Sequence, residues 1–241
     1  MSKLKKLPEK NLRFILKRMK DDIDRFGRPN NFISGSNRSI INDIFDDIGN
    51  FAAEHHSELI FMGTHGAQGW QHITGSYALR VVTSSQVPFV IVQDKTVKEG
   101  GYQSIVVPLD LHIQTRQKLS TVAKLADYFG SKVHIALPDE TDPELQAQLE
   151  DHKSVCEVFF KERNIEMDTK ILPHRDFEKE VVKYASQINA DLISIMNLNR
   201  SNIFSVFNAK YEQYIITNDA LIPTLILNPV EVQEIYGHWF T

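Results

Sequence analysis

The stretch GTHGAQGWQHITGS carries the densest set of residues in the sequence whose types and spacing suit chemistry. It follows the apolar run Leu59 to Met62 and precedes a segment with a helical pattern. A glycine-rich turn between a strand and a helix offers backbone N–H groups and the positive end of a helix dipole to an anion. Gly63 and Gly66 permit close backbone approach and positive φ. The loop is therefore predicted to cradle an anion such as a phosphate.

The end of the same loop supports this interpretation. Gly75 and Ser76 stand where a helix would begin, so Ser76 can cap the helix and also contact a phosphate. The loop lacks the Gly-Lys-Ser/Thr ending of the Walker motif and the Gly-x-Gly-x-x-Gly spacing of the dinucleotide fingerprint. Those two classes of nucleotide-binding enzyme are excluded, and the alternative is that the glycines only shape a turn.

Metal and hydrolase chemistry fit the sequence less well. Histidines gather near the loop, at His55, His56, His65 and His72, but their spacing matches no zinc pattern, so no metal is expected. Ser76 follows His72 by four residues, yet no acidic residue can be assigned as the third member of a triad. No catalytic residue is expected.

Composition and charge favour an ordinary soluble protein. The chain has 241 residues, 42% hydrophobic and 24% charged, with a net charge of -4, so no nucleic-acid partner is implied. The basic run at the start continues into an amphipathic pattern and is read as a solvated helix face. The single cysteine, Cys156, excludes an intrachain disulfide. No apolar window approaches the roughly 18 residues of a membrane span, so we expect a cytoplasmic protein with no membrane contact.

Hydrophobic periodicity predicts alternating strands and helices. Predicted strands span 31–34, 59–62, 88–92, 104–108, 132–137, 166–172, 191–196 and 223–227. Predicted helices span 12–23, 40–52, 76–85, 115–129, 143–163, 177–188 and 209–217. This alternation predicts an α/β fold with an open parallel sheet and helices on both faces.

Two passages recur in order. SELIFMG corresponds to ADLISIM, and SSQVPFVIV corresponds to NDALIPTLIL, at similar separations. The repeat predicts an internal duplication of one α/β unit. Four regions are predicted: a partial domain at 1–95 with the glycine loop, a linker at 96–103, a complete domain at 104–230 and a tail at 231–241.

The stretch LIFMGTHGAQGWQHITGSYALRVVTSSQVPFVIV resembles the C-terminal signature of the universal stress protein family. Gly63-Thr64-His65-Gly66 matches the opening of that family's phosphate loop and Gly75-Ser76 its close, although Ala67 to Thr74 is one residue shorter than the family pattern. The resemblance implies two tandem Rossmann-like units of the adenine nucleotide alpha hydrolase-like type, with the sheet order 3-2-1-4-5. It also implies an ATP or AMP site formed mostly by backbone groups of Met62, Gly63, Gly66, Gly75, Ser76 and Tyr77.

The two halves depart from the family in complementary ways. The second half has the acidic residue expected after the first strand, Asp110, which the resemblance places at the adenine-ribose end of a ligand. Its own phosphate loop, MNLNRSNIFSVFNAKYEQY, has no glycine, so it is expected not to bind nucleotide in the family manner. The first half has the glycine loop but lacks the first two strands of the unit and the helix between them.

The absent strands would leave unpaired backbone groups in the first half, which are costly when buried. Three explanations are open: a partner chain completes the sheet, the N-terminal helix and its neighbours are rearranged, or the protein has an upstream segment. The upstream segment is the simplest of these. Because final strands of family members pair across dimers, Phe89 to Val92 and Thr224 to Leu227 are expected to pair, in an intrachain pseudo-dimer or a homodimer.

The sequence therefore predicts a tandem-repeat universal stress protein: a cytoplasmic, non-catalytic, ATP-binding or AMP-binding stress-response protein. Two alternatives stay open at this point. One is a nucleotide-independent dimeric interaction module, and the other is a weak ATP hydrolase or transferase.

Overall fold

The computed structural model describes residues 49–63, 85–93, 100–111, 113–197 and 209–229, all of which belong to one compact unit, Asn42–Thr241. Several predicted features lie outside the described residues: the strand at 31–34, the helix at 12–23, the glycine loop beyond Gly63, the helix that follows it and the C-terminal tail.

After a short helical segment at 49–54 and the strands at 60–63 and 89–92, the described elements alternate from residue 104 onward, as the hydrophobic pattern predicts. In chain order they are β1 (Ile60–Gly63), β2 (Phe89–Val92), β3 (Ser104–Pro108), η1 (Ile113–Lys118), α5 (Leu119–Phe129), β4 (Lys132–Asp139), α6 (Pro143–Lys161), β5 (Met167–Pro173), α7 (Phe177–Gln187), β6 (Leu192–Met196), α8 (Ala209–Ile216) and β7 (Thr224–Leu227).

One element differs from its prediction. The helix expected over 115–129 begins as the 3-10 helix η1 at Ile113 and becomes α-helical only at Leu119. Thr115 and Lys118 of these first turns are both buried. A 3-10 segment at a helix start is common, and its side-chain period of three differs from the 3.6 used to place the helix.

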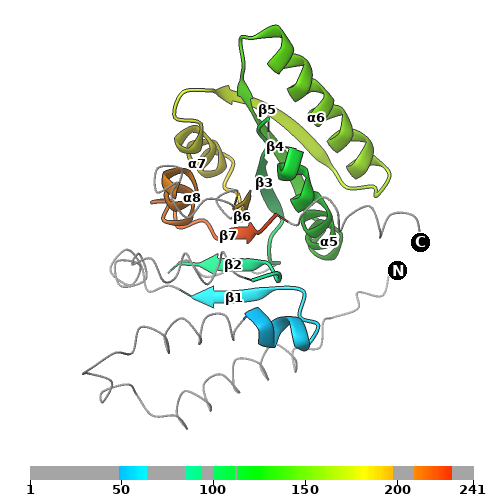
Figure 1. The fold of residues 1–241 in the computed structure, drawn as a ribbon, viewed down its shortest axis with the longest axis vertical. Coiled ribbons are helices and arrows are strands. Elements are labelled where there is room, and N and C mark those ends of the chain that lie inside the picture. The colour runs from blue at the N-terminus through cyan, green and yellow to red at the C-terminus, as the bar shows by residue number, and fades with distance from the viewer. Residues whose placement is uncertain (1–48, 64–84, 94–99, 112, 198–208, 230–241) are drawn as a thin grey trace. The chain divides into compact units, whose positions relative to one another are not determined.

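All described strands join one seven-stranded sheet in the order β1-β2-β7-β6-β3-β4-β5 (Figure 1). Strands β5-β4-β3-β6-β7 are parallel and reproduce the order 3-2-1-4-5 within the second half, which confirms that prediction. Strands β1 and β2 are also parallel to each other. Only β2 and β7 are antiparallel, with Phe89 opposite Ile226 and Ile91 opposite Thr224. The predicted pairing of the two final strands therefore occurs within the chain.

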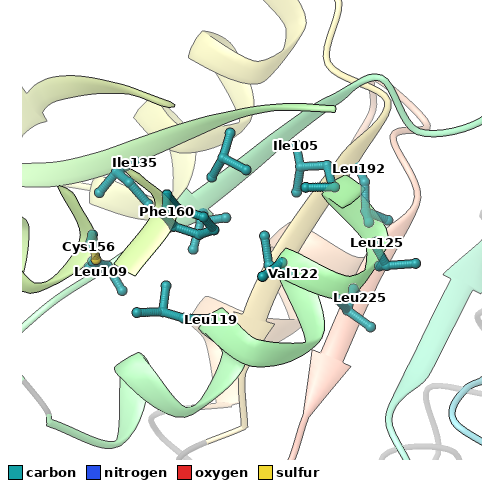
Figure 2. Close-up of a cluster of buried hydrophobic side chains, with 14 of the residues drawn as sticks. Ile105, Leu109, Leu119, Val122, Leu125, Ile135, Cys156, Phe160, Leu192 and Leu225 are labelled. Carbon is teal, nitrogen blue, oxygen red and sulfur yellow. The ribbon is translucent and has the colours of Figure 1, made fainter. Parts of the chain in front are cut away.

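Each face of the sheet carries its own hydrophobic core. One cluster joins α5 and α6 to the sheet through Val122, Cys156 and Phe160, all fully buried (Figure 2). The other joins α7 and α8 to the opposite face through Val181 and Ile215. Strands buried on both faces read as continuous apolar runs, which explains sequences such as LISIM in β6.

Local signals in the sequence set the ends of several elements. The carboxylate of Asp142 accepts hydrogen bonds from the backbone N–H groups of Glu144 and Leu145, and Pro143 opens α6. Gly130 ends α5 in the left-handed conformation. Gly101, at the end of the predicted linker, has φ of +78°, and a Cβ there would lie 2.3 Å from the Phe129 ring. Only glycine fits that position.

Candidate functional site

The predicted nucleotide loop starts at the carboxyl end of β1. Met62 packs partly buried against the core beneath α7 and α8, and Gly63, the last residue of β1, pairs in register with Val92 of β2. Ligands of open α/β sheets bind beyond the carboxyl ends of the strands. The structure therefore places Met62 and Gly63 at the edge where such a site forms. Gly66, Gly75, Ser76 and Tyr77 lie outside the described residues.

The residue that follows β2 ties this edge to the second half. Gln93 comes directly after Val92, the partner of Gly63, and its side-chain amide donates to the carbonyl oxygens of Ile216, at 2.9 Å, and Asn218, at 3.3 Å. The carboxyl end of β1 is therefore connected to the end of α8 through two steps: the pairing of Gly63 with Val92, and the hydrogen bond from Gln93 to Ile216.

A matching contact runs in the other direction. Asn228 comes directly after β7, as Gln93 comes directly after β2. Its side-chain amide donates to the carbonyl oxygen of Ser85 at 2.7 Å and accepts from Asn197 Nδ2 at 2.8 Å. Each half thus holds the loop before the other half's final strand, through an amide placed just beyond its own final strand. We call Gln93 and Asn228 the reciprocal amides.

The two loops that receive the reciprocal amides are also built alike. Ser85 Oγ donates to the carbonyl oxygen of Val87 and accepts from its N–H. Asn218 donates to the carbonyl oxygen of Ile222 and accepts from its N–H. Val87 and Ile222 each precede the proline before the final strand. The equivalence extends the repeat seen in the sequence to individual hydrogen bonds.

Removing a reciprocal amide is expected to weaken the contact between the halves. Gln93→Ala and Asn228→Ala should each lower the free energy of unfolding by about 1 kcal/mol, because each deletes a partly buried hydrogen bond between distant parts of the chain. Urea denaturation measures the change, and Gln148→Ala, at an exposed position on α6, is the control. Loss confined to one of the two variants would contradict the equivalence of the amides.

Asp110 lies two residues beyond β3, at the carboxyl end of the central strand of the second half. Its backbone carbonyl oxygen accepts a hydrogen bond from Nδ1 of His152, at 2.9 Å, so this nitrogen carries the proton. Burial is the largest cause that lowers the pKa of His152, followed by the nearby Arg116. A neutral His152 on α6 therefore fixes the backbone at Asp110.

A buried lysine closes the same end of β3. Lys118 is 1% exposed and donates from Nζ to the carbonyl oxygen of Pro108, the last residue of β3. Burial lowers its pKa from 10.5 to about 8, and the charges of Asp110 and Cys156 oppose that shift. Burial also raises the pKa of the Cys156 thiol from 9.0 to about 11.

These contacts lie where a ligand of the second half would be expected. The 3-10 helix η1 lies against β6, and its residue Lys118 reaches the end of β3. The strands β3 and β6 are the neighbours between which the strand order reverses, where doubly wound folds bind ligands. The buried Lys118 side chain therefore lies at the carboxyl end of β3, beside this position.

Neither metal nor membrane features emerge from the part of the chain that the structure describes. Within the described ranges, no three histidine, cysteine or acidic side chains come together as metal ligands do. His55 instead stacks on Phe51, with ring centroids 4.0 Å apart, and bonds the Phe51 carbonyl oxygen. Among the described helices none has both the length and the apolar character needed to cross a bilayer.

Sequence reasoning missed the roles of Lys118 and the reciprocal amides. Lys118 stands four residues before Val122 and seven before Leu125, on the apolar face of the helix, but its charge is typical of a surface residue. Gln93 and Asn228 carried a usable signal, because each directly follows the final apolar run of its repeat.

Comparisons with known proteins identify the fold. No protein-family model matches the sequence, and a sequence search finds no match among curated proteins. Among solved structures, a universal stress protein from Archaeoglobus fulgidus aligns with 92% of this chain and 77% of its own, at 18% identity and a TM-score of 0.62. A putative universal stress protein from Pseudomonas aeruginosa aligns with 98% of this chain and 82% of its own, at 12% identity and a TM-score of 0.57. The chain therefore has the fold of the universal stress proteins.

Proposed function

We propose that this chain is a non-catalytic, cytoplasmic universal stress protein whose first half binds an adenine nucleotide, ATP or AMP. The observation that carries the proposal is the position of Gly63. It ends β1 level with Val92, so the glycine loop starts at the carboxyl edge of a parallel strand pair. The proposed site is made by Met62, Gly63, Gly66, Gly75, Ser76 and Tyr77, mostly through backbone groups.

The two halves have different roles in this proposal: the first binds the nucleotide, and the second is its structural partner. The second half has its central strand end closed by Lys118 and η1, which supports binding in the first half alone. The β2–β7 pairing and the reciprocal amides support a duplicated unit arranged as an intrachain pseudo-dimer, with a partial domain at 1–95 and a complete one at 104–230. In such an arrangement the second half acts as the partner of the first.

The function would be exerted through linkage. A nucleotide that binds one conformation more tightly shifts the population presented to other proteins, by no more than its differential affinity for the two conformations. Gln93 supplies a physical route, since it joins the residue after β2 to the end of α8. No chemical step on the nucleotide is required.

Native mass spectrometry of the purified chain, followed by titration with ATP and AMP, tests the site. We expect one adenine nucleotide per chain, lost in Gly66→Val and in Gly75→Val because a side chain blocks the approach of backbone to phosphate. Ala67→Val, a neighbouring change of similar size, is the control and should keep the ligand. Unchanged affinity in both glycine variants would sink the assignment.

The same samples separate the alternative functions. A chain that takes up no nucleotide would favour the interaction module, with the glycines only shaping a turn. Phosphate release from ATP above the level of the Gly66→Val variant would favour a hydrolase.

A further inference from the structure

Strand β5 is the last strand at one end of the described sheet. Within the described residues it pairs only with β4, through seven register positions from Met167 to Pro173. The N–H of Val133 donates to the carbonyl oxygen of Glu166. Because backbone groups alternate sides along a strand, Asp168 and Lys170 also direct theirs toward β4. Met167, Thr169 and Ile171 therefore direct their backbone N–H and C=O groups away from the sheet.

The sequence of β5, MDTKILP, is complementary to itself in one antiparallel register. With Thr169 opposite the same residue of a second copy, Asp168 faces the second copy's Lys170, and Met167 faces its Ile171. The outward backbone groups then meet as hydrogen-bonded pairs, and the two charged pairs fall at the positions between them, where side chains approach most closely.

Repulsion between like charges disfavours the two registers that are shifted by one residue. Centring the pair on Asp168 would oppose two carboxylates, and centring it on Lys170 would oppose two ammonium groups, both of which destabilise a strand pair. Lys170 is exposed and forms no ion pair within the described part of the chain. Asp168 is 53% exposed and bonds Lys132 at 2.7 Å, so it can accept a second cation.

Exposed apolar side chains lie on one face of this edge. Ile171 is 62% exposed and shares its face of β5 with Met167, which packs against the core beneath α5 and α6. On the same face of the sheet, α6 leaves Val155 38% and Val158 58% exposed. In a continuous sheet made by two copies, both α6 helices lie on one side, where these side chains can be covered.

We propose that β5 is a homodimer interface, where two copies of the chain pair antiparallel about Thr169 and join their sheets edge to edge. This surface is separate from the β2–β7 pairing, which is already satisfied inside one chain. The partner is therefore a second copy of this chain, bound through backbone hydrogen bonds and two symmetric ion pairs.

Sedimentation of the full chain over a concentration series tests the interface with two designs. Thr169→Pro should abolish the dimer without unfolding the monomer, because proline is tolerated on an edge strand where the N–H points outward. In the second design, Lys170→Glu and Asp168→Lys should each weaken the dimer at least about tenfold through like-charge pairs. Lys132 keeps its partner Glu166 in the Asp168→Lys variant.

Mixing the two charge variants provides the decisive step. An equimolar mixture should form a heterodimer, since each acidic position of one variant then faces a lysine of the other, and native mass spectrometry resolves the two masses. A wild-type chain that stays monomeric throughout the series would overturn the proposal. So would a dimer that persists in Thr169→Pro, or variants that do not recover association on mixing.

Discussion

Asn218→Ala is expected to lower the free energy of unfolding by about 3 kcal/mol. Asn218 is 2% exposed, and its side-chain amide makes three short hydrogen bonds to backbone groups of Ile215 and Ile222, at 2.8 to 2.9 Å. Alanine removes all three and leaves the N–H and carbonyl oxygen of Ile222 without these partners in a buried loop. An unsatisfied buried polar group costs about 1 to 3 kcal/mol. Urea denaturation followed by circular dichroism measures the loss.

Ser85→Ala offers the matched comparison from the first half. The side chain of Ser85 bonds two backbone groups, both of Val87, so the loss of stability in Ser85→Ala should be roughly two thirds of that in Asn218→Ala. Asp219→Ala, at the exposed neighbouring position, should change stability by less than about 0.5 kcal/mol. The prediction would be contradicted if Asn218→Ala lowered the free energy of unfolding no more than Asp219→Ala. The loop would then rearrange without these hydrogen bonds, and they would not contribute to stability.

The second large effect concerns pH. Between pH 8 and 9 the free energy of unfolding should rise by about 1 kcal/mol through Lys118. Burial lowers the pKa of this amine to about 8 in the folded protein, against 10.5 for the exposed group. Above pH 8 the unfolded chain therefore binds more protons than the folded one, and stability increases with pH. The physical cause is the free energy needed to desolvate the charged amine, which destabilises the folded protein while Lys118 is protonated.

Cys156 opposes this rise above pH 9. Its buried thiol has a pKa raised from 9.0 to about 11, so the unfolded chain loses that proton first and stability falls with pH. The two shifts act in the same cluster, and the wild-type profile should be nearly flat between pH 9 and 10. Cys156→Ala should extend the rise from pH 8 to about 2 kcal/mol by pH 10, and Lys118→Met should remove it. Chemical denaturation at several pH values gives the profiles, and a rise retained in Lys118→Met would exclude this lysine as the source.

The residues behind these two predictions, Asn218 and Lys118, both lie in the second half of the fold. Asn218 receives Gln93 from the first half on its carbonyl oxygen, and Lys118 closes the end of β3 in the second. These two contacts support the proposal that the second half acts as a fixed partner of the first. The nucleotide proposed for the first half would then change the conformation of that half, while the second half keeps its own.

The sequence alone determined the element order and most of the topology. Apolar runs such as LISIM and SIVVP mark strands buried on both faces, and short loops and helical spacing between them leave a parallel sheet as the consistent answer. The repeat of SSQVPFVIV in NDALIPTLIL identified the two final strands, and the resemblance to the universal stress proteins, whose final strands pair across dimers, implied that β2 and β7 pair. It also located the start of the glycine loop at a strand end, because Gly63 directly follows an apolar run.

Only the tertiary structure decided which polar side chains serve the core. Lys118 carries a charge that is typical of a surface residue, and only the structure shows it buried, with its amine bonded to the carbonyl oxygen of Pro108. Gln93 and Asn228 meet backbone groups more than 120 residues away, a separation that periodicity cannot report. The free edge of β5 likewise emerges only when strand order is known, since a strand's own residues do not say which neighbour it lacks. Local pattern fixes the period of each element, whereas long-range packing fixes what its polar groups contact.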